Sequence, residues 1–489
     1  MLLALAVCLH LSTLPDSPPP YPYEFRGAWV ATVNNIDFPS RRGITEEEGR
    51  SEIKAIVAKA AELHLNALIF QVRPAADALY FSQTEPWSEF FTDQQGFPPD
   101  PVWDPLAVMI EEAHRAGIEL HAWINPFRVR HFTEHGPPSA LHLSLQHPDW
   151  VKKFGRYLWL DPGVPAARDH VIQVARDIVS RYDIDALHID DYFYPAPETG
   201  ASEFPDHDSY REYTLGGGHM SVEDWRRDNV NRVVSGLAKM VKEVKPYVKF
   251  GISPFGIARP GVPAGTQAGL DQYKTLYADP VMWLQEGWCD YLAPQLYWRI
   301  DRKPQAYAAL LNYWIDQNKL KRHIWPGNFT SQLIESDWTA DEIVRQIYLT
   351  EKTKGAGGNI QFSFKPLQEN SRGITDALES GPYKGQTLVP PSPWLQVESP
   401  YAPSVEWRRS ERTIRLAWNL DARSPRAQRW AVWIKYDSGW QFQVFGPQVQ
   451  NMEIPLAGLQ LVTVTAIGRN GLPGQYKSVA VNLKPGGPR

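Results

Sequence analysis

The chain has 489 residues, too many for one compact core, and this length predicts two domains or one large domain with an appendage. Its net charge of −5 provides no basic surface, so nucleic acid is not an expected partner. The two cysteines, Cys8 and Cys289, are too few for a disulfide framework or a cysteine-based metal site.

The N-terminal segment predicts export. Residues 1–12 are apolar but too few to span a bilayer, and they resemble the apolar region of a signal peptide. Leu5–Cys8 loosely resembles a lipoprotein box, which would place a lipid anchor at Cys8. A Pro-rich stretch follows, so residues 1–22 form the predicted leader of an exported protein of the periplasm or cell envelope. The alternative is a cytoplasmic protein with an apolar start.

After the leader, apolar strands alternate with helical patterns. The expected strands are Phe25–Thr32, Asn66–Pro74, Ile118–Phe127, Ile184–Pro195, Lys249–Gly256, Cys289–Trp298, His323–Phe329 and Asn359–Phe364. The expected helices are Glu47–His64, Pro105–Gly117, Ala167–Tyr182, Val222–Val244, Pro304–Asn318 and Ala340–Lys354. This alternation predicts an α/β fold, a (β/α)8 TIM barrel over residues 23–388. An open doubly wound sheet is the alternative, but it requires a glycine-rich turn after its first strand, and Val33–Pro39 contains no glycine.

The pattern changes at a Pro-rich linker, residues 389–399. Beyond it, residues 400–489 contain short strands and an Asn470-Gly471 turn, which predict a small β-sandwich of the fibronectin type III kind. Three tryptophans of this domain could form a sugar-binding patch or belong to its core, and the core is the preferred interpretation: Trp430, Trp433 and Trp440. The expected strands are Thr413–Trp418, Arg429–Tyr436, Trp440–Phe445, Met452–Pro455 and Leu461–Ile467.

Polar residues gather at the carboxyl ends of the predicted strands. Residues two apart on a strand share a face, so each of the following pairs is expected to point the same way. The pairs are Gln71 with Arg73, Trp123 with Asn125, His188 with Asp190, Gln295 with Tyr297, and Gln361 with Ser363. A barrel interior normally holds aliphatic layers, and active sites lie at the carboxyl ends, so the pairs predict a site rather than a polar plug.

Two adjacent carboxylates are the predicted catalytic residues. Glycoside hydrolysis needs one carboxyl group to protonate the leaving oxygen and another to attack the anomeric carbon or activate water. Asp190 ends a buried strand and is the best candidate for nucleophile or base. Asp191 would face the other way on an ideal strand, and a bend there would make it the acid. Other carboxylates that could lie on the same loops are Asp37, Asp77, Glu85, Asp161 and Glu203.

Sugar binding is assigned to polar and aromatic side chains near these carboxylates. An asparagine can hold a hydroxyl, an arginine can keep a carboxylate ionised, and a ring face can stack on a sugar. The predicted substrate-binding residues are Arg73, Asn125, Arg128, His188, Tyr192, Gln295, Tyr297, Trp298 and Asp37. Trp29 and Trp123 are expected either in the core or on the floor of a subsite. Neither a cofactor nor a metal is expected, because the histidines are scattered without ligand spacing.

Seven motifs resemble the glycosyl-hydrolase-like family ten, which includes a lipoprotein that digests denuded peptidoglycan strands. They are FRGAWVAT (25–32), FQVRP (70–74), HAWINPFR (121–128), LDPG (160–163), DDYFY (190–194), FGISP (250–254) and APQLYW (293–298). The resemblance implies a TIM barrel, export and glycosidase activity on glycan strands. Asp190 and Asn125 also resemble residues ending strands four and three of the α-amylase superfamily, but the acid of its strand five is absent from Gly251–Pro254.

These observations predict an exported glycoside hydrolase that cleaves a bacterial cell-wall polysaccharide, with peptide-free peptidoglycan strands as the expected substrate. The first alternative is a carbohydrate-binding protein on a barrel scaffold that has lost its second carboxylate. A metal-dependent deacetylase of the same polymer is a third class. Oligomeric state is not predicted by the sequence.

Overall fold

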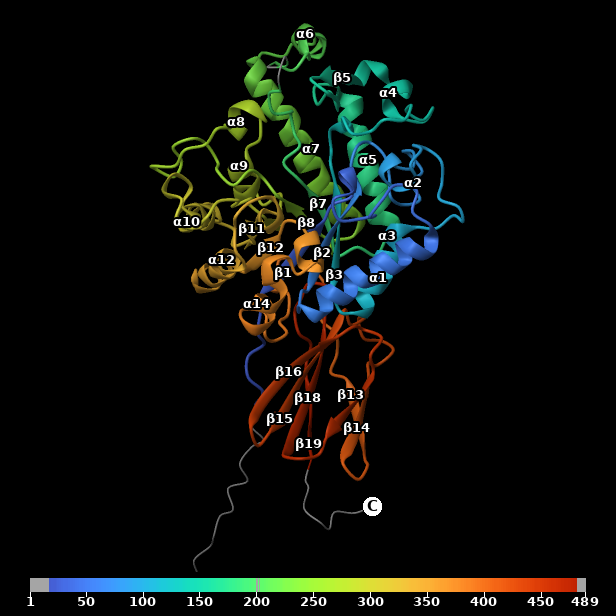
Figure 1. The fold of residues 1–489 in the computed structure, drawn as a ribbon, viewed down its shortest axis with the longest axis vertical. Coiled ribbons are helices and arrows are strands. Elements are labelled where there is room, and N and C mark those ends of the chain that lie inside the picture. Colours follow the sequence, from blue (N-terminus) through green and yellow to red (C-terminus); the bar gives the residue numbers. More distant parts are fainter. Residues whose placement is uncertain (1–16, 199–200, 202, 482–489) are drawn as a thin grey trace, which may run out of the picture.

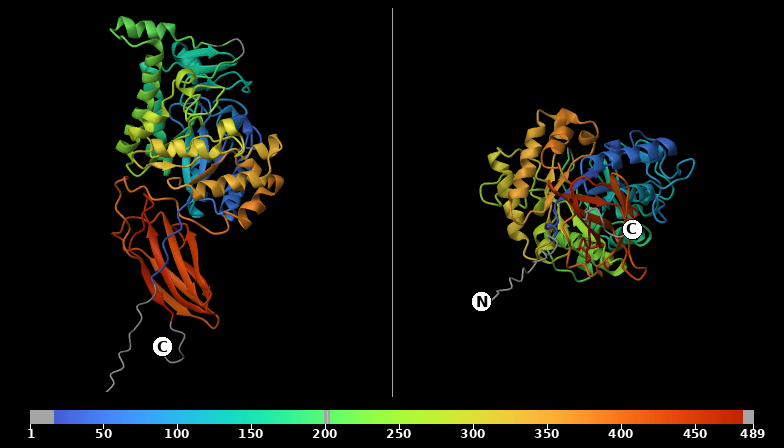
Figure 2. Two further views of the ribbon diagram at one scale, coloured as in Figure 1. Left: turned by 90° about the vertical axis from the view of Figure 1, so that its left-hand side faces the viewer. Right: turned by 90° about the horizontal axis from the view of Figure 1, so that it is seen from below.

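The computed structural model describes residues 17–198, 201 and 203–481. Figure 1 shows an upper body of strands and helices and, below it, a smaller body of strands only. Figure 2 shows the same arrangement from the side, with the C-terminal strands below the α/β body. The predicted signal-like residues 1–16, with Cys8, lie outside the described residues. Of the helices within the described residues, none combines the length and hydropathy that a membrane span requires.

Nine parallel strands form one curled sheet in the upper body, hydrogen-bonded in the order β10-β9-β8-β7-β3-β2-β1-β12-β11. The edge strands β10 and β11 are separated in the chain only by Trp325 and Pro326, so the two edges of the sheet meet on one stretch of chain. The α/β class and the curled parallel sheet are confirmed. The bounds are β1 (Phe25–Val30), β2 (Ala67–Arg73), β3 (Glu119–Ile124), β7 (Ala186–Ile189), β8 (Lys249–Ile252), β9 (Tyr291–Leu292), β10 (His323–Ile324), β11 (Gly327–Asn328) and β12 (Gly358–Gln361).

Every one of the eight predicted strands ends earlier than its apolar pattern, and of the predicted Ile184–Pro195 only Ala186–Ile189 is strand, so Asp190 and the residues after it lie beyond the strand end. Two other segments are interrupted as well. The segment 289–298 contains only the two-residue β9, and the segment 323–329 is divided into β10 and β11. Pro294 and Pro326 interrupt these segments because proline has no N–H to donate to a ladder. Their carbonyls still accept: Gly327 N donates to Pro294 O at 2.9 Å and Ile360 N to Pro326 O at 3.0 Å, so the sheet stays connected.

Helices cover the outside of this sheet (Figure 1). The six predicted helices are present with shifted ends, as α1 (Glu46–Glu62), α3 (Pro105–Arg115), α5 (Pro165–Arg181), α7 (Val222–Val244), α10 (Tyr307–Gln317) and α12 (Ala340–Lys352). Shorter helices that the pattern did not predict are α2 (Glu89–Thr92), α4 (Leu143–Gln146), α6 (His207–Leu215), α8 (Gln272–Thr275), α9 (Pro280–Gln285), α11 (Gln332–Glu335), α13 (Lys365–Gln368) and α14 (Ile374–Ser380).

The inside of the curled sheet is filled by rings. They form a buried cluster separate from the larger core that includes the helices; its aromatic members are Phe25, Trp29, Trp123, Tyr291 and Trp325. Gly251 on β8 makes room for one of them, because a Cβ there would lie 1.8 Å from Cζ of Tyr291. Trp29 and Trp123 are each 2% exposed, so both belong to this interior.

A small antiparallel sheet follows β3 and lies beside the carboxyl ends of the barrel strands. It contains β4 (Arg128–Arg130), β6 (Tyr157–Leu160) and β5 (Val151–Phe154), in that order. Arg128 is paired with Trp159 across this sheet. The pairing fixes the position of Arg128, which a flexible loop would not do.

The C-terminal body consists of two antiparallel sheets with their own apolar core. One sheet contains β13 (Ser404–Arg409), β14 (Thr413–Asn419) and β17 (Asn451–Pro455); the other contains β16 (Gly439–Phe445), β15 (Arg429–Tyr436), β18 (Leu459–Ile467) and β19 (Lys477–Ala480). The strands β13 and β19 were not predicted. Trp430 lies in the core, while Trp433 packs against Trp440 with ring centres 6.1 Å apart.

Buried ion pairs join the C-terminal body to the amino ends of the barrel strands. Glu119, at the start of β3, lies 2.9 Å from the ammonium of Lys249 and 3.4 Å from the guanidinium of Arg429 on β15. Burial opposes ionisation of Glu119, but these cations and a hydrogen bond with His121 outweigh it and lower its pKa to about 2. The C-terminal body therefore docks against the end of the curled sheet opposite Asp190.

Candidate active site

Asp190 directly follows β7 and is held by three donors. Its Oδ1 accepts hydrogen bonds from Ser253 Oγ at 3.0 Å, from Gln295 Nε2 at 2.9 Å and from the backbone N–H of Asp191 at 2.9 Å. The side chain is 8% exposed. Because β7 and β8 are paired in parallel register at Ile189 and Ile252, Ser253 necessarily lies beside Asp190.

The two neighbouring aspartates are electrostatically coupled. Burial raises the pKa of Asp190 to about 6, although its hydrogen bonds and the charge of Arg128 act against that rise. Burial and the negative charge of Asp190 raise the pKa of Asp191 well above its ordinary value. Two nearby carboxylates resist simultaneous ionisation, so one of the pair retains a proton at a pH where the other is charged.

Arg128 lies beside this pair. Its guanidinium carbon is 3.7 Å from the ring centre of Tyr192, a cation–π contact. Arg128 is 4% exposed, and its Nε has no hydrogen-bond partner within the residues that the structure describes. Burial, offset by the charge of Arg128, raises the pKa of Tyr192 to about 12. A buried cation with an unused donor can therefore serve a polar substrate or a carboxylate.

A cavity of about 400 Å³ opens next to Asp191. It offers rings on which a sugar could stack and two carboxylates, Asp191 and Glu198. Sequence patterns did not assign Glu198, which here accepts a bond from Arg156 N at 3.0 Å. The lining residues are Arg128, Tyr157, Trp159, Asp191, Tyr192, Tyr194, Pro195, Ala196, Pro197, Glu198, Phe255, Leu270 and Leu276.

The segment after β9 supplies further predicted residues. Gln295 orients Asp190 through its amide, which also donates to Ser253 O at 3.1 Å. Tyr297 stacks near Phe329, with ring centres 4.6 Å apart, and its pKa is raised well above normal by burial and then by the charges of Asp190 and Asp191. Trp298 packs edge-on against Phe255, which lines the cavity.

Other predicted binding residues have their polar atoms occupied by the protein itself. Arg73, 1% exposed, pairs with Glu85 at 2.6 Å, and Asn125, fully buried, accepts from Trp123 Nε1 at 2.9 Å and donates to Pro74 O at 3.0 Å. Asp37 accepts from Ala31 N, Ser363 Oγ and Lys365 N at 2.7 to 2.8 Å. These three side chains brace the loops around the site in this structure.

His188 lies one layer below Asp190 and is fully buried. Its Nδ1 is 2.8 Å from the hydroxyl of Tyr291, and its Nε2 is 2.9 Å from Ser253 Oγ and 3.2 Å from Trp29 Nε1. Burial lowers its pKa well below the ordinary value, so the ring is neutral. With both nitrogens engaged, His188 contacts other protein groups and influences Asp190 through Ser253.

Two hydroxyls complete a buried hydrogen-bonded chain. From Ser253 and His188 the chain continues through Tyr291 to His121 Nδ1 at 2.9 Å, and from His121 Nε2 to Glu119 at 3.0 Å. Sequence patterns missed both Ser253 and Tyr291. The available signal was positional: Ser253 follows β8, the neighbour of β7, by the same one-residue offset as Asp190.

The arrangement therefore places two coupled carboxyl groups, a buried arginine and several rings around one cavity. Within the described residues, no cluster of three or more histidine, cysteine, aspartate or glutamate side chains has the geometry to hold a metal ion. Paired carboxylates with separated pKa values are the groups that acid–base cleavage of a glycosidic bond uses. A curled parallel sheet with such a pair at its carboxyl edge is the arrangement of a glycoside hydrolase.

Comparison with known proteins identifies the particular family. The chain belongs to the family described as Glycosyl hydrolase-like 10, whose model matches residues 24–340. It is 41% identical over 392 residues to Glycosyl hydrolase YngK of Bacillus subtilis (78% of this chain, 76% of the relative). It is 34% identical over 402 residues to Glycosyl hydrolase DigH of Escherichia coli K12 (74% and 90%). A solved β-amylase catalytic domain from Paenibacillus polymyxa aligns with a TM-score of 0.47 at 11% identity, covering 75% of this chain and 98% of that domain.

Proposed function

We propose that the protein is an exported glycoside hydrolase that cleaves glycosidic bonds in peptide-free peptidoglycan strands. The observation that carries the proposal is the position of Asp190, at the carboxyl end of a central strand, held by Ser253 and Gln295 and adjacent to Asp191. Family membership supports the reaction type. The apolar N-terminal segment of the sequence supports export.

The two aspartates take different catalytic roles because their pKa values differ. Asp191, whose pKa is raised by burial and by the charge of Asp190, keeps its proton and delivers it to the leaving glycosidic oxygen. Asp190 is ionised above its pKa of about 6 and attacks the anomeric carbon or takes a proton from water. Arg128 holds Tyr192 in place and limits the pKa rise of both aspartates.

The remaining predicted binding residues fall into two groups. Arg128, Tyr192, Tyr297 and Trp298 surround the aspartates and contact the sugar, while Gln295 fixes Asp190. Arg73, Asn125, His188 and Asp37 shape the site by bonding to the protein.

We also propose the finer description of the architecture: a (β/α)8 TIM barrel over residues 23–388, a linker over 389–399 and a fibronectin type III-like sandwich over 400–489. The meeting of β10 and β11 on one segment supports barrel closure. The four-stranded and three-stranded sheets support a sandwich.

The proposal is tested by incubating purified protein with denuded glycan strands, with peptide-bearing peptidoglycan and with a neutral plant mannan, followed by mass spectrometry of the soluble products. Release of short sugar fragments from denuded strands, and much less from the other two polymers, is the expected result. Release from mannan alone would overturn the substrate assignment, and release from none would overturn the enzymatic function.

A further inference from the structure

Strand β16 directs its polar side chains inward, the reverse of what a sandwich strand requires. In its pairing with β15, Gln441 lies opposite Ile434 and Gln443 opposite Val432. Val432 and Ile434 belong to the sandwich core, and directly opposed residues of an antiparallel pair share a face. Gln441 and Gln443 therefore occupy inner-face positions where apolar residues are expected.

The outer face of the same strand is apolar and is covered. Phe442 and Val444 pack with Leu388 and Tyr21, and the rings of Tyr21 and Phe442 lie 6.1 Å apart. Val444 N also donates to Gln386 Oε1 at 2.8 Å. The inner face of β16 therefore packs on the sandwich core only at its end, through Phe445, while Gln441 and Gln443 face the gap between the two sheets.

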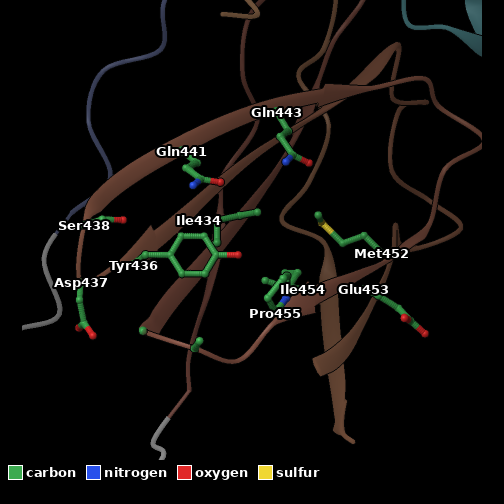
Figure 3. Close-up of a pocket in the computed structure, with 12 residues that line it drawn as sticks. Ile434, Tyr436, Asp437, Ser438, Gln441, Gln443, Met452, Glu453, Ile454 and Pro455 are labelled. Carbon is green, nitrogen blue, oxygen red and sulfur yellow. The ribbon is translucent and has the colours of Figure 1, made fainter. Parts of the chain in front are cut away.

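That gap is a groove of about 520 Å³, here called the sandwich groove. Figure 3 shows Tyr436, Gln441 and Gln443 on one side, and Met452 and Ile454 of β17 on the other. Within the described part of the chain, the Tyr436 hydroxyl and both glutamine amides have no hydrogen-bond partner. Two amides and a phenol consequently present free donors and acceptors beside a ring.

We propose that the sandwich groove binds a neutral stretch of glycan through sugar hydroxyl and acetamido groups. Each glutamine amide offers two donors and an acceptor, and the Tyr436 ring with Ile434 offers an apolar surface for a pyranose face. The groove lining contains two carboxylates, Asp437 and Glu453, and no basic residue, which disfavours phosphate, sulfate and uronate groups. The proposal takes only its choice of polymer from the proposed function.

The groove lies in the lower body of Figure 1, which docks at the amino ends of the barrel strands, whereas Asp190 follows the carboxyl end of β7. It is a separate site that retains the polymer, not an extension of the catalytic cavity. Binding is measured on the full chain carrying Asp190→Asn, a substitution chosen to prevent turnover of the sugar.

Hydrogen–deuterium exchange of that protein, with and without the tetramer of N-acetylglucosamine, locates the bound sugar. Protection of peptides spanning 436–443 and 452–458 is expected. Adding Gln441→Ala and Gln443→Ala should lower the affinity for the sugar at least tenfold and remove this protection. Gln448→Ala, which changes an exposed glutamine outside the groove, should leave both unchanged.

Protection confined to the catalytic end, or absent everywhere, would overturn the proposal that the sandwich groove binds glycan. Protection of the groove by peptide-bearing peptidoglycan fragments but not by the tetramer would also overturn it, in favour of a peptide partner. If wild-type protein cleaves no glycan while the groove is still protected, the proposed function fails and the groove stands. If glycan is cleaved while the groove is unprotected, the proposed function stands and the glycan-binding groove fails.

Discussion

The hydroxyl of Ser253 lies 3.0 Å from Oδ1 of Asp190 and 2.9 Å from Nε2 of His188, so one small side chain connects the proposed catalytic carboxylate to the buried interior. A serine has one proton to donate, and its partner choice depends on the charge of Asp190. When Asp190 is ionised, donation to the carboxylate is favoured. Ser253 thereby stabilises the ionised form of Asp190, the form that the proposed mechanism uses.

Replacing Ser253 with alanine should raise the pKa of Asp190 further. The lost hydrogen bond to a charged group is worth about 1.5–3 kcal/mol, which corresponds to roughly one to two pKa units. The acid limb of the kcat/KM profile should move to higher pH by about one unit. Ser235→Ala, which removes a hydroxyl bonded within α7, is the control and should leave the profile in place. An unmoved acid limb in Ser253→Ala would show that this bond does not set the pKa.

Asp190 and Asp185 flank the same strand and should respond oppositely to amide substitution. The folded-state pKa of Asp190, about 6, lies above the ordinary value, so stability falls as pH rises through the interval between about 4 and 6. Asp190→Asn should therefore stabilise the protein at pH 7 by up to about 3 kcal/mol, with the gain vanishing near pH 4.

Asp185 is paired with His114 at 2.8 Å. The pKa of Asp185 is lowered, because the attraction of partners such as His114 outweighs the effect of burial. Its contribution is present above about pH 4 and is lost as pH falls further. Asp185→Asn should cost about 3–5 kcal/mol at pH 7. Denaturant unfolding of both variants across pH tests these two predictions. Stability changes of the same sign at pH 7 would contradict them.

Arg128 should act through both charge and shape. Arg128→Ala removes a cation that favours ionisation of both aspartates, so the pH optimum should rise and kcat/KM should fall about 10- to 100-fold, the scale of a few kcal/mol. Arg128→Lys keeps the charge without the planar stacking on Tyr192, and should raise KM more than it lowers kcat. Arg259, whose guanidinium carbon lies 3.5 Å from the ring centre of Tyr273, is a matched control for loss of an arginine–ring contact.

Gly251 should tolerate no side chain. Its Cβ would overlap the Tyr291 ring, which is fully buried and cannot move aside without displacing His121 and His188. Gly251→Ala should lower the free energy of unfolding by more than 4 kcal/mol or prevent soluble expression. Gly269→Ala meets open space and should be close to neutral. Comparable stabilities of the two variants, measured by urea unfolding, would contradict this packing.

Much of the curled parallel sheet could be predicted because buried parallel strands read as continuous apolar runs. Asp190 was identifiable since it interrupts such a run where the strand ends. The length of the segments around Pro294 and Pro326 was overestimated because apolar composition does not reveal which N–H groups find partners. The inverted faces of β16 were hidden for a similar reason: alternation shows two faces but not which face the rest of the chain covers.

His188 illustrates why the site could be only partly predicted. Residues two apart share a face, and His188 and Asp190 do so, yet their rise along the strand places His188 inside the curled sheet and Asp190 at its carboxyl edge. Ser253 and Tyr291 come from other strands, and their roles depend on register between strands. A single sequence specifies each strand's pattern but not that register.

The role of Asp190 is tested by comparing the products that wild type and Asp190→Asn release from denuded glycan strands in ¹⁸O-labelled water. Mass spectrometry of the products and urea unfolding of both proteins would be recorded together. We expect fragments carrying one ¹⁸O from the wild type, none from Asp190→Asn, and a variant at least as stable as the wild type. Undiminished ¹⁸O-labelled fragments from folded Asp190→Asn would contradict this role.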